Sequence, residues 1–178
     1  RKHASIVGVT KYLPAIAGDG LLEEIKNIDY FIKNPKKPIL AIIGGSKIST
    51  KINLLQNLTE YFDDISICGA MANTFLTANG YNMGKSLVEM DKLEIAKRIL
   101  LDASKTKTKI ILPIDFNGEL DEFGSGNLEY ANYDDIKKNM ICEDIGELSV
   151  NLFADIISKS KTIFWNGTVG DAENKDFA

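Results

Sequence analysis

Cysteine, histidine and aromatic residues are scarce in this 178-residue sequence, and each shortage excludes a kind of chemistry. The single histidine, His3, excludes a histidine pair or a catalytic triad built within the chain, and a packing or hinge role is favoured for it. Cys68 and Cys142 lie in apolar surroundings without metal-ligand spacing, so we interpret them as reduced thiols of a cytoplasmic protein. Aromatic residues form 8% of the chain and do not alternate with basic ones, which argues against a platform for single-stranded nucleic acid.

An excess of positive charge and a long hydrophobic run are also missing. The net charge is −4, so no basic field attracts nucleic acid or an anionic membrane surface. No apolar segment approaches the roughly 18 residues that a membrane span requires. The hydrophobic content of 44% suffices for one sizeable core and part of a second. The chain opens Arg-Lys-His-Ala-Ser, with neither an initiator methionine nor a signal peptide, and we expect it to be a fragment of a longer protein.

The strongest local pattern is a loop that follows an apolar run. Residues 38–43 show no polar alternation and are bounded by proline and glycine, which predicts a buried parallel strand. Residues 44–51 read Gly-Gly-Ser-Lys-Ile-Ser-Thr-Lys, in which two glycines permit a sharp turn and close approach to a ligand. A helix expected to begin near Ile48 would direct its unpaired N–H groups at the same point. Lys47 and Lys51, four residues apart, would share one face of that helix.

These eight residues match neither the Walker A spacing nor the GxGxxG fingerprint of dinucleotide-binding folds. They therefore predict a pocket for an anion, with phosphate as the best fit. A Gly-Gly turn that carries two solvated lysines is an alternative that the octet alone leaves open.

Strands and helices are expected to alternate along the rest of the chain. Residues 1–18 should be loop-like, and residues 114–140 a polar, turn-rich excursion at the sheet edge. Helical spacing or strand-like runs predict the remaining elements. Helices are expected up to about Lys33 with Asp19 as the cap, around 52–58, at 70–78, at 89–103 and around 148–157, and strands at 65–69, 109–112 and 162–165. This order predicts an α/β fold, a three-layer Rossmann-like parallel sheet with helices on both faces, preceded by a connecting helix.

The glycine-containing loops all follow predicted strands. Gly44-Gly45, Gly69-Ala70 and Asn166-Gly167 would therefore converge on one crevice at the carboxyl ends of the sheet, where ligands bind in such folds. Trp165, at the end of a strand, is interpreted as a core residue.

Seven segments, in order, resemble the motifs of phosphoglycerate kinases. They are the opening R-x-H-A-S, the GG-(A/S)-K-x-x-x-K loop at 44–51, the GGG-M-x-x-T-F stretch at 68–76, G-x-S-L-x-E-x-D at 84–91, LP-x-D at 112–115, D-I-G-P at 144–146 and W-N-G-P at 165–167. Each motif alone is weakly specific, whereas the ordered set covers nearly the whole chain. The resemblance implies a kinase of two lobes that transfers a phosphoryl group between 1,3-bisphosphoglycerate and ADP in glycolysis.

Under this resemblance, residues 1–20 would be a remnant of the amino-terminal substrate lobe, and residues 21–37 the connecting helix and linker. Residues 38–178 would form the nucleotide-binding lobe, incomplete at its carboxyl end. The family pattern places 3-phosphoglycerate or 1,3-bisphosphoglycerate on the missing lobe, so we expect this chain to be inactive alone. Surface exposed by the truncation could support a dimer.

The resemblance also implies roles for individual residues. The catalytic lysines at the nucleotide phosphates and the transferred group would be Lys47 and Lys51. The other nucleotide-binding residues would be Gly45, Ser46, Gly69, Asn166 and Glu173, and Arg1 would contact the substrate phosphate. The implied cofactor is Mg-ADP or Mg-ATP, but the family's metal-holding aspartate lies outside this chain, so no metal ligand is assigned. A helix N-terminus behind residues 144–146 is expected to add backbone donors for phosphate.

Departures from the family pattern gather around the nucleotide. Cys68 and Ala70 replace glycines and are expected to put side-chain bulk on the adenosine wall. Glu143 introduces a carboxylate near the base or the phosphates, and Glu147 and residues 168–172 replace a more rigid, apolar sequence. Glu173 lies in this altered region and could be a plain surface residue. Two alternatives therefore stay open: a non-catalytic remnant or binding module of the same fold, and a generic phosphosugar-binding domain.

Overall fold

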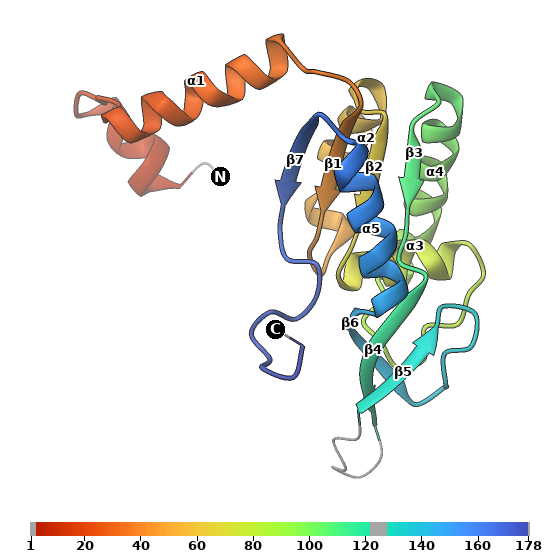
Figure 1. Ribbon diagram of the computed structural model, residues 1–178. Helices are drawn as coiled ribbons and strands as arrows, with labels where there is room; N and C mark the ends of the chain where they lie inside the picture. The colour runs from red at the N-terminus through yellow and green to blue at the C-terminus, as the bar shows by residue number, and fades with distance from the viewer. Residues whose placement is uncertain (1–2, 122–127, 178) are drawn as a thin grey trace. The chain divides into compact units, whose positions relative to one another are not determined.

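The computed structural model describes residues 3–121 and 128–177, which belong to two compact units, Arg1–Pro35 and Lys36–Ala178. The first unit carries helix α1, Asp19–Lys33, which ends as predicted but begins one residue earlier, because Gly18 and not Asp19 is its N-cap (Figure 1). Residues 1–18 were expected to be loop-like, and this is wrong for part of them. A π-helical turn spans Ala4–Gly8, where the carbonyl of His3 accepts bonds from three successive N–H groups, and a 3₁₀ turn spans Val9–Lys11, where the Tyr12 N–H donates to the Val9 carbonyl.

The second unit is built on a four-stranded parallel sheet in the order β3-β2-β1-β7. Its strands are β1 (Ile39–Ile43), β2 (Asp64–Ile67), β3 (Lys109–Ile111) and β7 (Thr162–Asn166). All five residues of β1 are buried, as the run without alternation predicts. Because the strands are parallel, the loops that follow β1, β2 and β7 leave the sheet at one edge.

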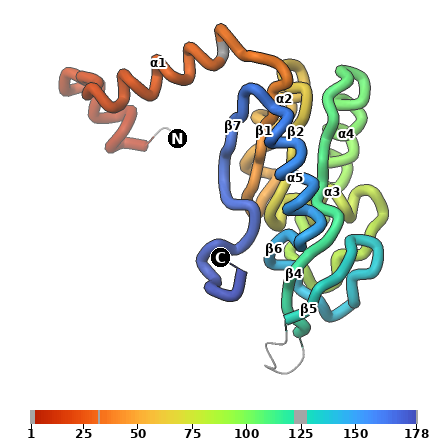
Figure 2. The backbone as a smooth tube through the Cα atoms, in the orientation of Figure 1, coloured from red at the N-terminus to blue at the C-terminus, as the bar shows by residue number. Residues whose placement is uncertain are grey.

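Helices cover both faces of this sheet, which confirms the three-layer α/β prediction (Figures 1 and 2). Ala41 and Ile43 face one side, where they pack in a core with α2 (Ile52–Tyr61), α3 (Ala70–Ala78) and α4 (Leu93–Thr106). Leu40 and Ile42 face the other side, where Phe153 of α5 (Glu147–Lys159) packs against them. Strand alternation thus assigns successive β1 residues to separate cores.

The expected polar excursion at 114–140 is wrong, because this region forms most of a second sheet. Its strands are β4 (Asp115–Leu120), β5 (Leu128–Asn132) and β6 (Met140–Ile145), antiparallel in the order β5-β4-β6. Phe116, Ala131 and Met140 are buried in its core. The alternation is hidden in the sequence, since the pairing register shifts at Asn117/Gly118 and one buried position is the polar Asp115.

The turn after β1 also differs from the expected helix. A 3₁₀ turn, η3, spans Ile48–Thr50, and α2 begins only at Ile52. Lys47 is extended, with φ −131° and ψ 120°, and Lys51 is the cap residue before α2. The two lysines therefore do not share a helical face. Two i→i+3 bonds of 2.8 Å cause the tighter turn: the Thr50 hydroxyl donates to the Lys47 carbonyl, and the Lys51 N–H donates to the Ile48 carbonyl.

The remaining elements follow the expected order. The helix expected at 89–103 begins as a 3₁₀ turn, η4 (Met90–Lys92), before α4. Within the described ranges, no helix combines the length and the apolar character needed to cross a membrane.

Candidate functional site

Three strand-end loops meet at the carboxyl edge of the parallel sheet, as predicted. The Gly44 N–H donates to the Asn166 carbonyl at 2.9 Å, and the Met71 N–H donates to the Gly45 carbonyl at 2.9 Å. A Cβ atom on Gly44 would lie 1.8 Å from the carbonyl oxygen of Thr168. This junction needs glycine because two backbones approach each other more closely than any side chain permits.

Lys51 ties the ends of β1 and β7 together. Its ammonium donates to the Gly44 carbonyl at 2.7 Å and to Asn166 Oδ1 at 2.5 Å. Burial lowers the pKa of the Lys51 ammonium. The structure thus brings together two residues that the sequence assigned to the nucleotide, and it holds them by bonds within the loop junction.

An open cavity of about 440 Å³ lies beside this junction. Three residues assigned to the nucleotide, Gly45, Ser46 and Gly69, line it together with Ala70, Leu87, Ile141, Cys142, Glu143, Thr168, Gly170 and Asp171. Lys51 lies behind Gly45, since a Cβ on that glycine would be 3.6 Å from the lysine Nζ. The size of the cavity is within the range of small-molecule sites.

Lys47 and Glu173, which were also predicted to bind nucleotide, do not line this cavity. Lys47 is exposed on the turn that leads from the loop into α2. Glu173 is also exposed and does not line the cavity; its N–H donates to Asp171 Oδ1 at 3.2 Å. Arg1 lies outside the described residues.

The far wall of the cavity carries carboxylates. Glu143, on β6, has its pKa raised by burial, then by the negative charges of Asp171 and Glu119. The Asp171 N–H donates to the Glu143 carbonyl at 3.0 Å, so the segment after β7 runs along β6. Gly170 permits this approach, because a Cβ there would lie 2.0 Å from Asp144 Oδ1.

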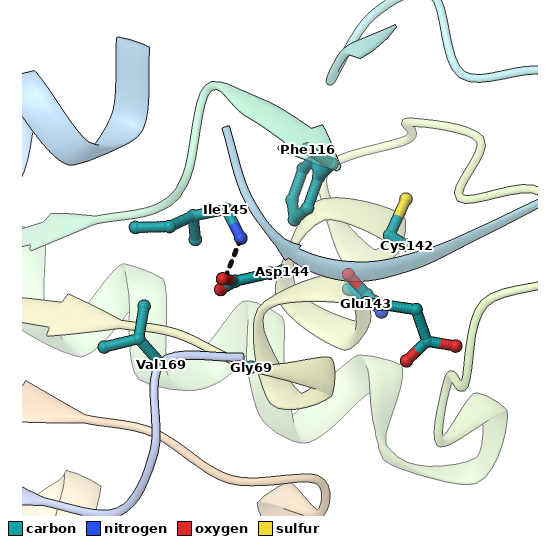
Figure 3. A pocket seen from close by; sticks show the side chains of 8 residues that line it. Gly69, Phe116, Cys142, Glu143, Asp144, Ile145 and Val169 are labelled. Carbon is teal, nitrogen blue, oxygen red and sulfur yellow. Dashed lines mark hydrogen bonds between the residues drawn. The ribbon is translucent and has the colours of Figure 1, made fainter. Parts of the chain in front are cut away.

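Asp144 itself closes a small inner cavity beneath the acidic wall (Figure 3). This cavity has a volume of about 10 Å³, enough for one water molecule, and Gly69, Phe116 and Val169 also line it. Burial raises the pKa of the Asp144 carboxyl, while a 2.7 Å bond from the Ile145 N–H to Oδ1 acts in the opposite direction. The segment therefore holds a second partly buried acid close to the first.

Cys68 does not face the adenosine wall, so that expectation is wrong. Its side chain is fully buried in the core with Leu40 and Ile145, and burial and the charge of Asp144 raise the pKa of its thiol to about 12. The side chain follows strand alternation into the core beneath α5. Of the two residues that replace glycines, only Ala70 lines the cavity.

The expected donor patch at the start of α5 is also wrong. Asp115 is fully buried and accepts bonds from the N–H groups of Leu148 at 2.9 Å and of Ser149 at 2.7 Å. The Ser149 hydroxyl donates to the same carboxylate. An internal carboxylate therefore occupies donors that a phosphate would need. The LP-x-D motif contains this aspartate, but its partners on α5 lie 33 and 34 residues further along the chain, so no local signal in the sequence identifies it as the cap.

Trp165 is exposed over 57% of its surface, contrary to the expected core position. It lies on the edge strand β7, on the same face as Ile163, and its indole N–H donates to the Gly167 carbonyl at 2.9 Å. In the ranges 3–121 and 128–177, no group of three or more histidine, cysteine, aspartate or glutamate side chains is placed to hold a metal ion.

These features define a Rossmann-like α/β domain with a lysine-bearing loop and a cavity at the carboxyl edge of its sheet. The family model for phosphoglycerate kinase matches residues 1–178, and the chain belongs to that family.

Curated relatives and solved structures agree with this assignment. Phosphoglycerate kinases from Finegoldia magna and Thermosipho africanus are 42% and 43% identical, over all of this chain and over 45% and 44% of their own lengths. The structure of phosphoglycerate kinase from Coxiella burnetii matches with a TM-score of 0.85 at 36% identity, over 98% of this chain and 45% of that one. The structure from Pyrococcus horikoshii, 24% identical with a TM-score of 0.84, supports the fold alone. The chain spans less than half the length of these relatives.

Proposed function

We propose that this chain supplies the nucleotide-binding lobe of a phosphoglycerate kinase, which transfers a phosphoryl group between 1,3-bisphosphoglycerate and ADP. The observation that carries the proposal is the loop junction: Gly45, Ser46 and Gly69 line one cavity, and Lys51 and Asn166 stand directly behind it. Residues 38–178 are the proposed lobe, residues 21–37 the connecting helix and linker, and residues 1–20 the end of the substrate lobe. The whole reaction needs a substrate lobe in addition.

Phosphoryl transfer depends on positioning and on neutralising charge, with little covalent chemistry for the protein. The exposed ammonium of Lys47 and the backbone at Gly45 and Ser46 would hold the nucleotide phosphates at the mouth of the cavity. The ammonium of Lys51 would contribute positive charge from behind the loop. The base would lie along the wall formed by Gly69, Ala70 and Leu87.

Magnesium, when bound with the nucleotide, supplies charge neutralisation at the phosphate oxygens. Among the residues that the structure describes, no group of three or more histidine, cysteine, aspartate or glutamate side chains is placed to hold it. The metal ligand is therefore assigned to a part of the protein outside this chain.

Because both thiols are buried and unpaired, we assign the protein to the reducing cytoplasm.

One observation favours a second candidate, a binding module of the same fold with weakened nucleotide affinity. Glu143 and Asp171 present negative charge to the same cavity that would receive a polyphosphate. These two carboxylates would repel the negatively charged phosphates of a nucleotide in the cavity, most strongly at low salt. The two candidates differ in the affinity for Mg-ADP, which the second candidate would have lost to the point that no binding is measured at several millimolar nucleotide.

Calorimetric titration with Mg-ADP separates the candidates. The kinase lobe should bind Mg-ADP at micromolar to millimolar concentration, and Lys47→Ala should weaken binding about tenfold by removing one phosphate contact. Lys47 is exposed, so this variant keeps the fold. Lys105→Ala is the matched control, because Lys105 is an exposed lysine that pairs with Asp102 on α4. Absence of heat at several millimolar nucleotide would favour the binding-module reading over the kinase.

A further inference from the structure

Glu89 links the lysine-bearing turn to helix α3. Its Oε2 accepts a bond from the Ser49 N–H at 3.1 Å, and its Oε1 accepts one from the Ser49 hydroxyl at 2.6 Å. The N–H of Glu89 donates to the hydroxyl of Thr74, a fully buried residue of α3, at 3.1 Å. Glu89 thus contacts the turn η3 with its carboxylate and helix α3, whose first residue Ala70 lines the cavity, with its backbone.

Ser49 is the middle residue of η3, and Lys47 and Lys51 stand immediately before and after that turn. The N–H groups in the first turn of a helix have no acceptor within the helix. The Glu89 carboxylate satisfies the Ser49 N–H from outside and fixes the exposed side of the turn. On the inner side, the fully buried side chain of Ile48 anchors the same turn in the core.

The carboxylate of Glu89 does not line the 440 Å³ cavity, although Leu87, two residues earlier, does. A negative charge close to a phosphate site would oppose binding if it only faced the ligand. Here both carboxylate oxygens are directed at Ser49. The contacts therefore point to a role that acts through the turn.

We infer that Glu89 is a positioning residue, whose two bonds to Ser49 hold Lys47 and Lys51 in the orientation that receives phosphate. The identity of the bound phosphate rests on the proposed function, whereas the link from Glu89 to Ser49 does not. Removing the carboxylate should release the turn and lower the affinity for phosphate-bearing ligands. The contact with Thr74 uses the backbone of Glu89, so the α3 side of the cavity should keep its structure.

The test compares three variants of the full chain by amide hydrogen exchange and by titration with Mg-ADP and with adenosine. Glu89→Ala removes both bonds. Glu89→Gln can still accept from the Ser49 N–H through Oε1 and donate to its hydroxyl through Nε2. Asp91→Ala is the matched control, because Asp91 is an exposed acid two residues away that pairs with Lys92.

In Glu89→Ala we expect the Ser49 amide to exchange at least about tenfold faster and Mg-ADP to bind about tenfold more weakly, with adenosine affinity unchanged. Glu89→Gln should recover most of both properties, and Asp91→Ala should change neither. Unchanged exchange at Ser49 in Glu89→Ala would overturn the inference, as would an equal loss of affinity for adenosine and Mg-ADP.

Two further arms keep the test decisive. If Glu89→Ala does not fold, Ser49→Ala takes its place: it removes the 2.6 Å bond alone, and we expect about a threefold loss for Mg-ADP with adenosine unchanged. If the unmodified chain binds no Mg-ADP, the proposed function fails, and exchange at Ser49 still decides whether Glu89 holds the turn.

Discussion

The two walls of the cavity are built on opposite principles. The wall on the parallel sheet consists of glycine backbone, with an ammonium held between strand ends by Gly44 and Asn166. The opposite wall carries Glu143 of β6 and Asp171 of the segment after β7, and burial followed by the charge of Asp171 raises the pKa of Glu143. The first wall suits an anion, and the second opposes one. The comparison teaches that fitness for phosphate is a local property of the β1 loop and does not extend across the site.

The largest effect is expected from Asp115, the first residue of β4, which caps helix α5. Asp115→Ala removes the buried carboxylate that caps α5 at Leu148 and Ser149, leaving buried donors without partners. We expect the free energy of unfolding to fall by about 3 kcal/mol, measured by denaturant titration. Asp121→Ala, which removes an exposed acid paired with Lys85, is the control and should change little. Equal losses in the two variants would contradict the capping role.

A smaller effect is expected at Asp144, behind the same wall. Its raised pKa means that the folded state binds the proton more tightly than the unfolded chain, so stability is lost as pH rises from the unfolded value through the folded one. Asp144→Asn, which keeps an acceptor for the Ile145 N–H, should raise the thermal unfolding midpoint by a few degrees at pH 7. That gain should disappear towards pH 3. A gain of constant size at every pH would exclude the carboxylate charge as its cause.

The smallest effect is expected from Glu143, whose charge distinguishes the second wall from the first. Glu143→Gln removes one negative charge from the cavity lining, and we expect Mg-ADP to bind roughly threefold more tightly at low salt. The difference should shrink in 0.5 M salt because screening weakens the repulsion. Glu60→Gln changes an exposed acid on α2 and is the matched control. Tighter binding to both variants would show a general effect of net charge instead.

The parallel wall was largely predictable, and the antiparallel wall was not. The strand β1 and the convergence of its loop with Gly69 and Asn166 follow from an apolar run and from the rule for parallel strand ends. The 3₁₀ turn at η3 was missed, because its cause is a hydroxyl of Thr50 bonded to a backbone carbonyl. Local patterns do not reveal such a bond.

The second sheet was missed for a different reason. Its strand β4 begins with Asp115, a buried acid whose partners lie 33 and 34 residues away on α5. From the sequence alone, a polar residue at a core position is predicted to be exposed to solvent, because its distant hydrogen-bond donors are not known. The position of Cys68 could not be predicted for a related reason. Only the assembled sheet determines that Cys68 faces the core, whereas Gly69 and Ala70 face the cavity.

The segment from Asn166 to Asp171 is bonded at one end to β1 and at the other to β6, and it therefore works as a spacer between the two sheets. Its span is fixed by Gly167, with φ +91°, and by Gly170, which touches Asp144. We therefore expect the width of the cavity to depend on how many residues this spacer contains. Changing its length by a single residue would resize the opening for every ligand, whatever side chains line it.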